Sequence, residues 1–232
     1  MSAPLHPFAL AAGGPALDAA FAIGLVASYL LGAIPFGLVT VRLVKGIDLR
    51  TVGSGNIGAT NAMRVLGKPL GLLAFALDVA KGFVPAAVIA PWCTAAGDAS
   101  IATAVLFAAA AVLGHVFPVY LGFKGGKAVA TSCGGLLAID PLVVLIGGAA
   151  WLVALGTARM VSVASLAMAL AFAGAAWWRA PRFEGGIFLA VGTSALLVLI
   201  VWRHRSNIGR ILAGTEPRIG GSRIERDTEA TP

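Results

Sequence analysis

Long stretches without a charged residue recur along the chain and set its organisation. Four of them run for 18 to 25 residues: Ala19–Val41, Ala99–Phe123, Met160–Trp178 and Gly185–Trp202. A helix needs about 20 mainly apolar residues to cross the hydrocarbon core of a bilayer. Pro69–Gly97 is equally apolar apart from Asp78 and Lys81. The pattern predicts at least five membrane-spanning helices.

Ala128–Ala158 is a longer apolar stretch of 31 residues, interrupted only by Asp140-Pro141. Proline lacks a backbone donor, and the residue before it avoids the helical region. The stretch is therefore either one long helix or two helices joined by a turn at Asp140. In the second case Ala128–Ile139 forms a helix only about 18 Å long.

The placement of charges chooses between six spans and seven. With seven spans and an outer N-terminus, 14 of the 17 basic residues fall on the cytoplasmic side. Six spans would place Arg159 and the basic C-terminal segment outside, against the positive-inside rule. We therefore predict an all-α polytopic membrane protein with seven transmembrane helices, its N-terminus outside and its C-terminus in the cytoplasm.

Three regions follow from this topology. Residues 1–18 form an extracytoplasmic extension, 19–216 the helical membrane domain, and 217–232 a polar cytoplasmic tail. The extension contains no Lys or Arg, so it lacks the basic region of a signal peptide. We expect the first span to be retained as an anchor.

Composition agrees with this topology. Apolar residues make up 59% of the chain and charged residues 12%, and the mean hydropathy is +0.92. Such a chain is too apolar for an ordinary soluble domain, a disordered chain or a disulfide scaffold. Cys93, Cys133 and three scattered histidines show no metal or redox spacing. We expect no metal, no cofactor and no nucleic-acid partner.

The first polar cluster follows the first span and is rich in glycine. Glycines let backbone amides turn toward an anion, neutral side chains supply further donors, and arginine matches phosphate geometry. The terminal Lys-Ser/Thr of a nucleotide-binding P-loop is missing. The candidate phosphate-site residues are Gly53, Ser54, Gly55, Asn56, Gly58, Thr60, Asn61 and Arg64.

The second cluster, Lys124-Gly125-Gly126-Lys127, precedes the fourth span. Amides at a helix N-terminus attract anions, and lysine adds a point charge. Simple positive-inside anchoring is the alternative, although the two glycines between the lysines argue against it. His115 lies just upstream and is interpreted as a packed histidine.

The third cluster follows the last span. His204 and Asn207 are three residues apart and Arg210 is three further on, so a continuing helix places them on one face. Histidine is the side chain best suited to proton transfer near neutral pH. The alternative is a basic segment attracted to anionic lipid. Glu216 is the acidic residue closest to this cluster.

Asp78 and Lys81 lie within the second span, three residues apart. Each charge alone would cost about 2.5–3.5 kcal/mol at the middle of a span, so mutual neutralisation is expected. A structural ion pair and a direct catalytic role both remain open for them.

The three clusters share the cytoplasmic face and suit a phosphorylated small molecule with a lipid or acyl partner. The rival hypothesis is a transporter or channel for a phosphorylated anion. Passage would require polar residues along several spans, whereas here they gather at one face. A structural membrane subunit would leave the loops unexplained.

These motifs resemble the bacterial acyl-phosphate-dependent glycerol-3-phosphate acyltransferases. The resemblance rests on the segments Gly53–Arg64, Phe123–Thr131 and His204–Glu216, and on Asp78-Val-Ala-Lys-Gly82. The His-x4-Asp motif of other glycerolipid acyltransferases is absent, because Ala11, Tyr120 and Gly209 stand five residues after the three histidines. One departure is Ala128, where the family usually has glycine.

The resemblance implies an enzyme of the bacterial inner membrane, with its active site facing the cytoplasm. It would transfer a fatty acyl group from acyl phosphate to the 1-hydroxyl of glycerol 3-phosphate, giving lysophosphatidic acid and phosphate, the first step of phospholipid synthesis. Acyl-CoA would not be the donor. Membrane lipid is the other expected partner, and a monomeric bundle is expected.

The resemblance also assigns roles. Ser54, Arg64, Lys124, His204 and Asn207 would be catalytic. The remaining motif residues and Arg210 would bind substrate or phosphate, including Lys127, while Asp78, Lys81 and Glu216 would give structural support. Because acyl phosphate is already activated, we expect direct attack rather than an acyl-enzyme at Ser54. The general base is either His204 or the substrate's own phosphate.

Overall fold

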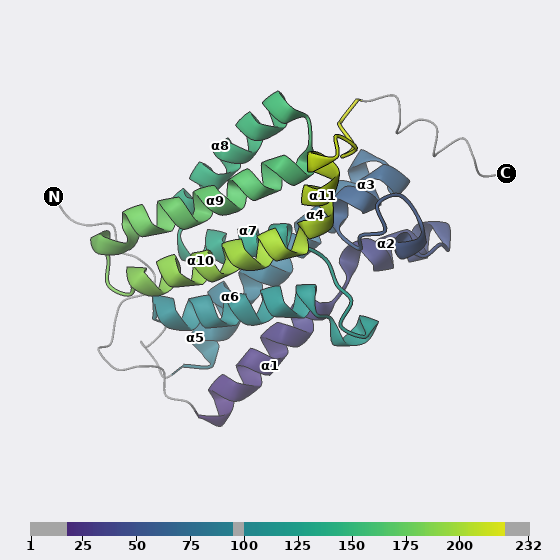
Figure 1. The fold of residues 1–232 in the computed structure, drawn as a ribbon. Coiled ribbons are helices and arrows are strands. Elements are labelled where there is room, and N and C mark those ends of the chain that lie inside the picture. Colours follow the sequence, from purple (N-terminus) through teal and green to yellow (C-terminus); the bar gives the residue numbers. More distant parts are fainter. Residues whose placement is uncertain (1–17, 95–99, 221–232) are drawn as a thin grey trace.

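The computed structural model describes residues 18–94 and 100–220, and every regular element in these ranges is helical (Figure 1). The extension 1–17 and the tail from residue 221 onward lie outside the described residues. The elements are α1 (Ala19–Ala33), α2 (Phe36–Lys45), α3 (Ala59–Leu66), α4 (Lys68–Val84), α5 (Ala90–Trp92), α6 (Ile101–Val116), α7 (Val129–Ile139), α8 (Pro141–Ala158), α9 (Val161–Arg179), α10 (Gly186–Arg203) and α11 (Arg205–Leu212). Short turns of other helix types join some of them: Leu49–Thr51, Pro85–Ile89, Val119–Leu121 and Ala180–Arg182.

Five helical segments in the described ranges are long and apolar enough to cross a membrane: Lys68–Trp92, Ile101–Leu121, Pro141–Ala158, Val161–Arg182 and Gly186–Arg203. The bent pair α1 and α2 makes a sixth if it counts as one span. Helix α7 is apolar but has only 11 residues. The protein is thus an all-helical membrane protein with five or six full-length apolar segments.

The first predicted span, Ala19–Val41, is not one helix. It divides into α1 and α2, which meet at an angle of 41°. The cause is Pro35, which lacks a donor and holds Ile34 in an extended conformation with φ −63° and ψ 117°. The Ile34 carbonyl left free by the break accepts a hydrogen bond of 2.7 Å from Lys81 Nζ.

The predicted break at Asp140-Pro141 is confirmed by the boundary between α7 and α8. Asp140 caps α8 by accepting a 3.1 Å hydrogen bond from the Leu142 amide, and Pro141 occupies the first helical position. The carboxylate of Asp140 also pairs with Arg179 at the end of α9. The choice of two helices over one was therefore correct.

Small residues let the helices approach one another closely. Gly82 of α4 lies against the backbone carbonyl of Thr131 in α7, and Gly134 lies against the carbonyl of Val79. A Cβ at either glycine would collide with backbone atoms, which cannot move aside. As in other membrane bundles, glycine at the crossing point allows the helices to pack.

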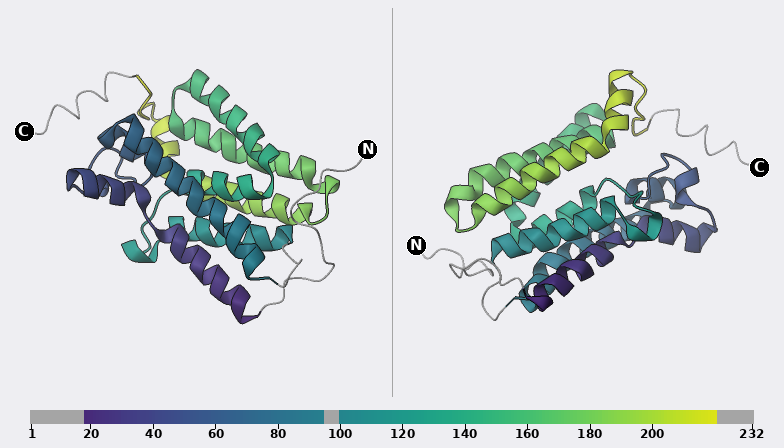
Figure 2. Two further views of the ribbon diagram at one scale, coloured as in Figure 1. Left: turned by 180° about the vertical axis from the view of Figure 1, so that it is seen from behind. Right: turned by 60° about the horizontal axis from the view of Figure 1, so that its bottom comes forward.

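The three polar clusters lie at one end of the bundle, the right-hand end in Figure 1, with α2, α3 and α11 (Figures 1 and 2). After α11 the chain turns back, and the Ile219 amide donates a 2.8 Å hydrogen bond to the Arg159 carbonyl between α8 and α9. Segments from both ends of the sequence therefore meet at this end of the bundle.

Candidate active site

A polar cleft of about 260 Å³ opens where the three clusters meet. Four of its ten lining residues are cationic, and none is acidic. The lining consists of Ser54, Gly55, Asn56, Gly125, Lys127, Arg203, Arg205, Ser206, Asn207 and Arg210. Cations and neutral hydrogen-bonding groups without a carboxylate make a cleft suited to phosphate.

A chain of hydrogen bonds links the second and third clusters along one side of the cleft. Lys127 Nζ donates to Asn207 Oδ1 at 2.5 Å, and Asn207 Nδ2 donates to Glu216 Oε1 at 2.6 Å. Arg210 Nε donates to the other carboxylate oxygen of Glu216 at 2.7 Å. Glu216 thus orients Asn207 and Arg210 toward the cleft without lining it.

Burial and the surrounding charges together lower the pKa of Lys127. Burial, the largest cause, lowers the pKa of Lys127 to about 8, and the positive charges of Arg210, Arg64 and Arg203 lower it further against the opposing effect of Glu216. Burial also lowers the pKa of the Arg64 guanidinium. The cleft therefore holds a lysine whose charge is sensitive to mildly alkaline pH.

Asn61 shapes the first loop from inside and does not line the cleft. The residue is 1% exposed, and the two hydrogens of its Nδ2 are shared among the carbonyls of Leu49, Val52 and Asn56 at 3.0 to 3.1 Å. Its Oδ1 accepts from the Ser54 amide at 2.9 Å. In this structure the hydrogen-bonding groups of the Asn61 side chain therefore serve the loop itself.

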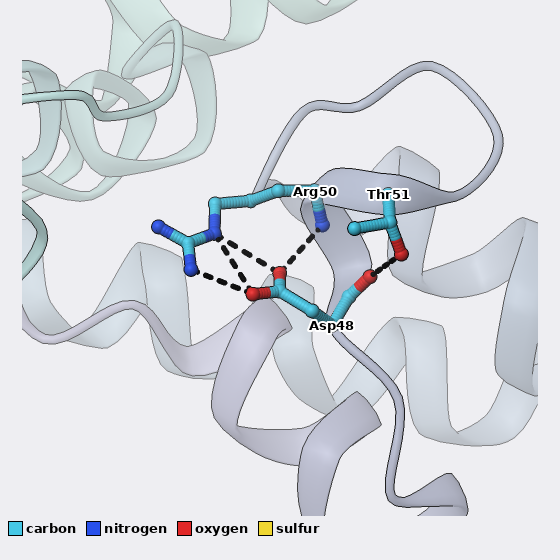
Figure 3. Close-up of polar contacts among 3 residues, drawn as sticks. All are labelled: Asp48, Arg50 and Thr51. Atoms are coloured by element: carbon cyan, nitrogen blue, oxygen red, sulfur yellow. Dashed lines mark hydrogen bonds and ion pairs between the residues drawn. The ribbon is translucent and has the colours of Figure 1, made fainter.

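The segment before this loop is fixed by a compact clasp (Figure 3). The guanidinium of Arg50 and its backbone amide all donate to the Asp48 carboxylate at 2.6 to 3.1 Å, and Thr51 Oγ1 donates to the Asp48 carbonyl at 2.9 Å. Hydrogen bonds from the Arg50 side chain and amide lower the pKa of Asp48 to about 2. The clasp fixes the backbone from which the Gly53–Gly58 loop starts.

The glycine amides of the second cluster donate to backbone carbonyls at the end of α6. Gly125 N donates to the Val116 carbonyl at 3.2 Å, and Gly126 N donates to the His115 carbonyl at 3.0 Å. In the first loop the Gly55 and Gly58 amides are likewise taken, by the Val52 carbonyl and by Asn56 Oδ1. In this structure these four amides are therefore used by hydrogen bonds within and next to the loops.

His204 lies at the junction of α10 and α11 and is 2% exposed. Its Nδ1 is 2.8 Å from the Ile200 carbonyl. Since a carbonyl can only accept, Nδ1 carries the proton and Nε2 keeps its lone pair. Burial and the nearby Lys127 charge lower the pKa of His204 to about 4, so the ring is neutral at physiological pH.

The structure brings together most, though not all, of the residues expected at the site. Those lining the cleft are Ser54, Gly55, Asn56, Gly125, Lys127, Asn207 and Arg210. Those outside its lining are Gly53, Gly58, Thr60, Asn61, Arg64, Lys124, Gly126, His204 and Glu216. Arg64 is close enough for its charge to act on Lys127, whereas Lys124 is solvent-exposed.

Arg203, Arg205 and Ser206 line the cleft although they were not expected there. Arg203 and Arg205 flank His204 in the third cluster, and both guanidinium groups lie over the ring of Trp202, at 5.4 and 5.1 Å from its centroid. Their positive charge was attributed to membrane orientation. Their position directly beside the predicted site was the signal that could have identified them.

The predicted ion pair in the second span forms. Lys81 Nζ lies 2.9 Å from Asp78 Oδ1, with side-chain exposures of 1% and 2%. His115 Nδ1 lies 3.9 Å from the same carboxylate oxygen. Within residues 18–94 and 100–220, no three His, Cys, Asp or Glu side chains gather closely enough to hold a metal ion.

Comparison with known proteins identifies the family to which the chain is similar. A family model described as glycerol-3-phosphate acyltransferase matches residues 22–214. The chain is 43% identical over 198 residues to the glycerol-3-phosphate acyltransferase of Macrococcus caseolyticus, covering 85% of this chain and 96% of that protein. It is 45% identical over 204 residues to that of Anaeromyxobacter sp. strain Fw109-5, covering 85% and 97%.

Two solved structures share the fold. The glycerol 3-phosphate form of PlsY (YgiH), an integral membrane glycerol 3-phosphate acyltransferase, superimposes with a TM-score of 0.78 at 40% identity. That match covers 86% of this chain and 96% of the other. The lysophosphatidic acid form gives a TM-score of 0.76 at 37% identity, covering 89% and 98%.

Proposed function

The chain belongs to the glycerol-3-phosphate acyltransferase family, and we propose that its acyl donor is an acyl phosphate and that transfer takes place in the cleft beside Lys127. The protein is an integral membrane acyltransferase of glycerol 3-phosphate, and family membership selects this activity over a transporter. The observation that carries the donor proposal is the cationic lining without an acidic residue. An acyl phosphate and glycerol 3-phosphate each bring a phosphate that such a lining would stabilise.

The proposed reaction is a direct displacement. The 1-hydroxyl oxygen of glycerol 3-phosphate attacks the acyl carbonyl carbon, and the bond from that carbon to the phosphate oxygen breaks. The hydroxyl proton passes to an oxygen of the phosphate group of glycerol 3-phosphate, and the products are lysophosphatidic acid and inorganic phosphate. Negative charge grows on the departing phosphate, where preorganised cations lower the barrier.

The residues divide between charge stabilisation and support. Lys127 and Arg210 would bind phosphate oxygens directly, and Arg64 would add charge from α3. Ser54 and Asn56 would donate neutral hydrogen bonds from the opposite wall. Ser54 has no base among its hydrogen-bond partners in the described residues, which supports direct transfer over an acyl-enzyme at its hydroxyl.

The substrate phosphate is a better proton acceptor than the His204 imidazole. A general base works best when its pKa lies near the operating pH, and the pKa of His204 is about 4. The second ionisation of a phosphate monoester lies near 6. We therefore assign His204 the orientation of the substrate hydroxyl through Nε2, with phosphate taking the proton.

The topology completes the proposal. Counting α7 and the bent pair α1 and α2 with the five long segments gives seven crossings. In this arrangement the cleft would face the cytoplasm of a bacterial inner membrane, because 14 of the 17 basic residues then lie on that side. Residues 19–216 would act as one monomeric unit, with the 217–232 segment as a cytoplasmic tail.

The donor comparison tests the proposed function. Purified protein with acyl phosphate and glycerol 3-phosphate is expected to release phosphate and form lysophosphatidic acid, and phosphate release should require both substrates. Acyl-CoA offered at the same concentration should give no product above background. Folded protein that uses acyl-CoA, or that leaves acyl phosphate intact, would disprove the assigned donor.

The titration of Lys127 predicts an alkaline limit to activity. Since the pKa of Lys127 is about 8, kcat/KM should fall as pH rises through 8, where the lysine loses the charge that holds phosphate. The substrate phosphate is already a dianion there and contributes no change. Lys127→Arg should move the limit upward by at least about two pH units, since arginine stays charged. Initial rates between pH 6 and pH 10 measure this, and an unmoved limit would assign it to another group.

A further inference from the structure

The Gly125–Gly126 turn is held from two sides, and these contacts fix the position of the backbone that carries Lys127. On one side its amides donate to the carbonyls of Val116 and His115, at the end of α6. On the other side its two carbonyls face Arg203 at the end of α10. Both peptide groups are therefore fixed by segments distant in the sequence.

Arg203 makes the second of these contacts with two donors at once. Its Nε donates to the Gly126 carbonyl at 3.0 Å, and its Nη2 donates to the Gly125 carbonyl at 2.5 Å. The planar guanidinium suits two parallel acceptors, which a lysine ammonium cannot match with the same geometry. The Trp202 ring lies against the guanidinium and contacts Phe117, with centroids 6.0 Å apart, so the side chain is braced.

The turn cannot shift toward α6, because His115 fills the space behind it. The His115 side chain is 5% exposed, and a Cβ placed on Gly126 would collide with its imidazole. The ring is in turn backed by the Asp78–Lys81 pair. The turn thus lies between a fixed ring and a fixed guanidinium.

We propose that Arg203 is a positioning residue, which places the Lys127 ammonium in the cleft by holding the Gly125–Gly126 turn against the end of α6. This inference rests on the proposed function for its kinetic consequence, although the geometry of the turn stands independently. It assigns Arg203 a part distinct from Arg205. Arg205 also lines the cleft and contacts Trp202, but the described residues show no bond from it to the turn.

The substitution of arginine by lysine separates positioning from charge. Arg203→Lys keeps the positive charge at the cleft but loses the fork that holds two carbonyls. If Arg203 acts by positioning, Arg203→Lys and Arg203→Gln should each lower kcat/KM at least tenfold, mainly by raising KM for glycerol 3-phosphate. If Arg203 acts as a charge on substrate, Arg203→Lys should stay within about threefold of wild type while Arg203→Gln fails, and the proposal is overturned.

A readout without turnover distinguishes failure of this inference from failure of the proposed function. The pH dependence of Lys127 acetylation by acetic anhydride, resolved residue by residue by mass spectrometry, measures its pKa in folded protein. The groups facing Lys127 are Arg64, Arg203, Arg210, Glu216, His204 and, through its hydrogen bond, Asn207. Arg203→Lys should raise the pKa of Lys127 from about 8 by at least one unit, since the released lysine becomes hydrated while the charge at 203 is kept. Arg205→Lys is the matched control and should change it by less than half a unit, whereas an unchanged pKa in Arg203→Lys would refute the proposal.

A second pair of variants tests whether the Gly125–Gly126 turn is held in place against His115, and it can be used if the arginine variants fail to fold. Gly126→Ala forces a Cβ into His115 and should displace the turn, raising the pKa of Lys127 as Arg203→Lys does. In the background of His115→Ala the added methyl group finds space, and the shift should be at least half reversed. An equal shift in the single and double variants would mean that the turn is not held against this ring, which contradicts the proposal.

Discussion

Replacing Lys127 by methionine is expected to lower kcat/KM by about a hundredfold to a thousandfold. This range is typical for removal of one preorganised group that stabilises charge in a transition state. Lys127 is the residue most suited to this role, because it lines the cleft, donates to Asn207 and is surrounded by arginines. Initial rates of phosphate release over a matrix of both substrate concentrations would measure the loss.

Lys124→Met is the matched comparison for this experiment. The same substitution three residues away removes a lysine from the same loop, but Lys124 is solvent-exposed and does not line the cleft. Its loss should lower kcat/KM by less than about tenfold. Equal losses in the two variants would show that net positive charge, rather than the position of Lys127, controls the reaction.

Removing the imidazole by His204→Ala should lower kcat at least about thirtyfold. At the junction of α10 and α11 the ring Nδ1–H donates to the Ile200 carbonyl. The backbone carbonyl of His204 accepts from the Ile208 amide at 2.8 Å, a bond that the alanine variant keeps. The ring Nε2 would orient the substrate hydroxyl. Loss of a hydrogen bond in a buried, charged site has an effect of about 2–3 kcal/mol, which corresponds to this decrease.

His204→Asn tests whether the ring acts as a base or as an orienting group. An amide oxygen can accept a hydrogen bond but cannot take the proton at neutral pH. If His204 orients the hydroxyl, the asparagine variant should recover at least tenfold over alanine. If His204 is the base, the two variants should be equally impaired. Thermal unfolding of each purified variant would show that the fold is retained.

Features governed by neighbours in the sequence were predictable. The break at Asp140-Pro141 follows from the covalent chemistry of proline, and the capping aspartate confirms it. The same chemistry at Pro35 was overlooked, because the apolar run around it is long enough for one span. The gathering of three loops at one end was also predictable, since it follows from the number of crossings between them.

Features governed by partners distant in the sequence could not be predicted. The Gly126 amide was expected to face an anion, but its partner is His115, and its carbonyl partner is Arg203, 77 residues away. Asn61 looked like a ligand and instead holds its own loop together. A glycine-rich motif indicates an unusual backbone path, but the sequence does not show which groups that path leaves free.

The hydrogen bond between Ile219 and Arg159 has a consequence for how the enzyme is made. Chains emerge N-terminal end first, and the first loop of the site is synthesised well over a hundred residues before Glu216. Glu216 orients Asn207 and Arg210, and the Ile219–Arg159 contact anchors the segment that carries it. Contacts that support the cleft therefore come from the part of the described chain that is synthesised last. A nascent chain still lacking this segment would hold the earlier loops without their final partners.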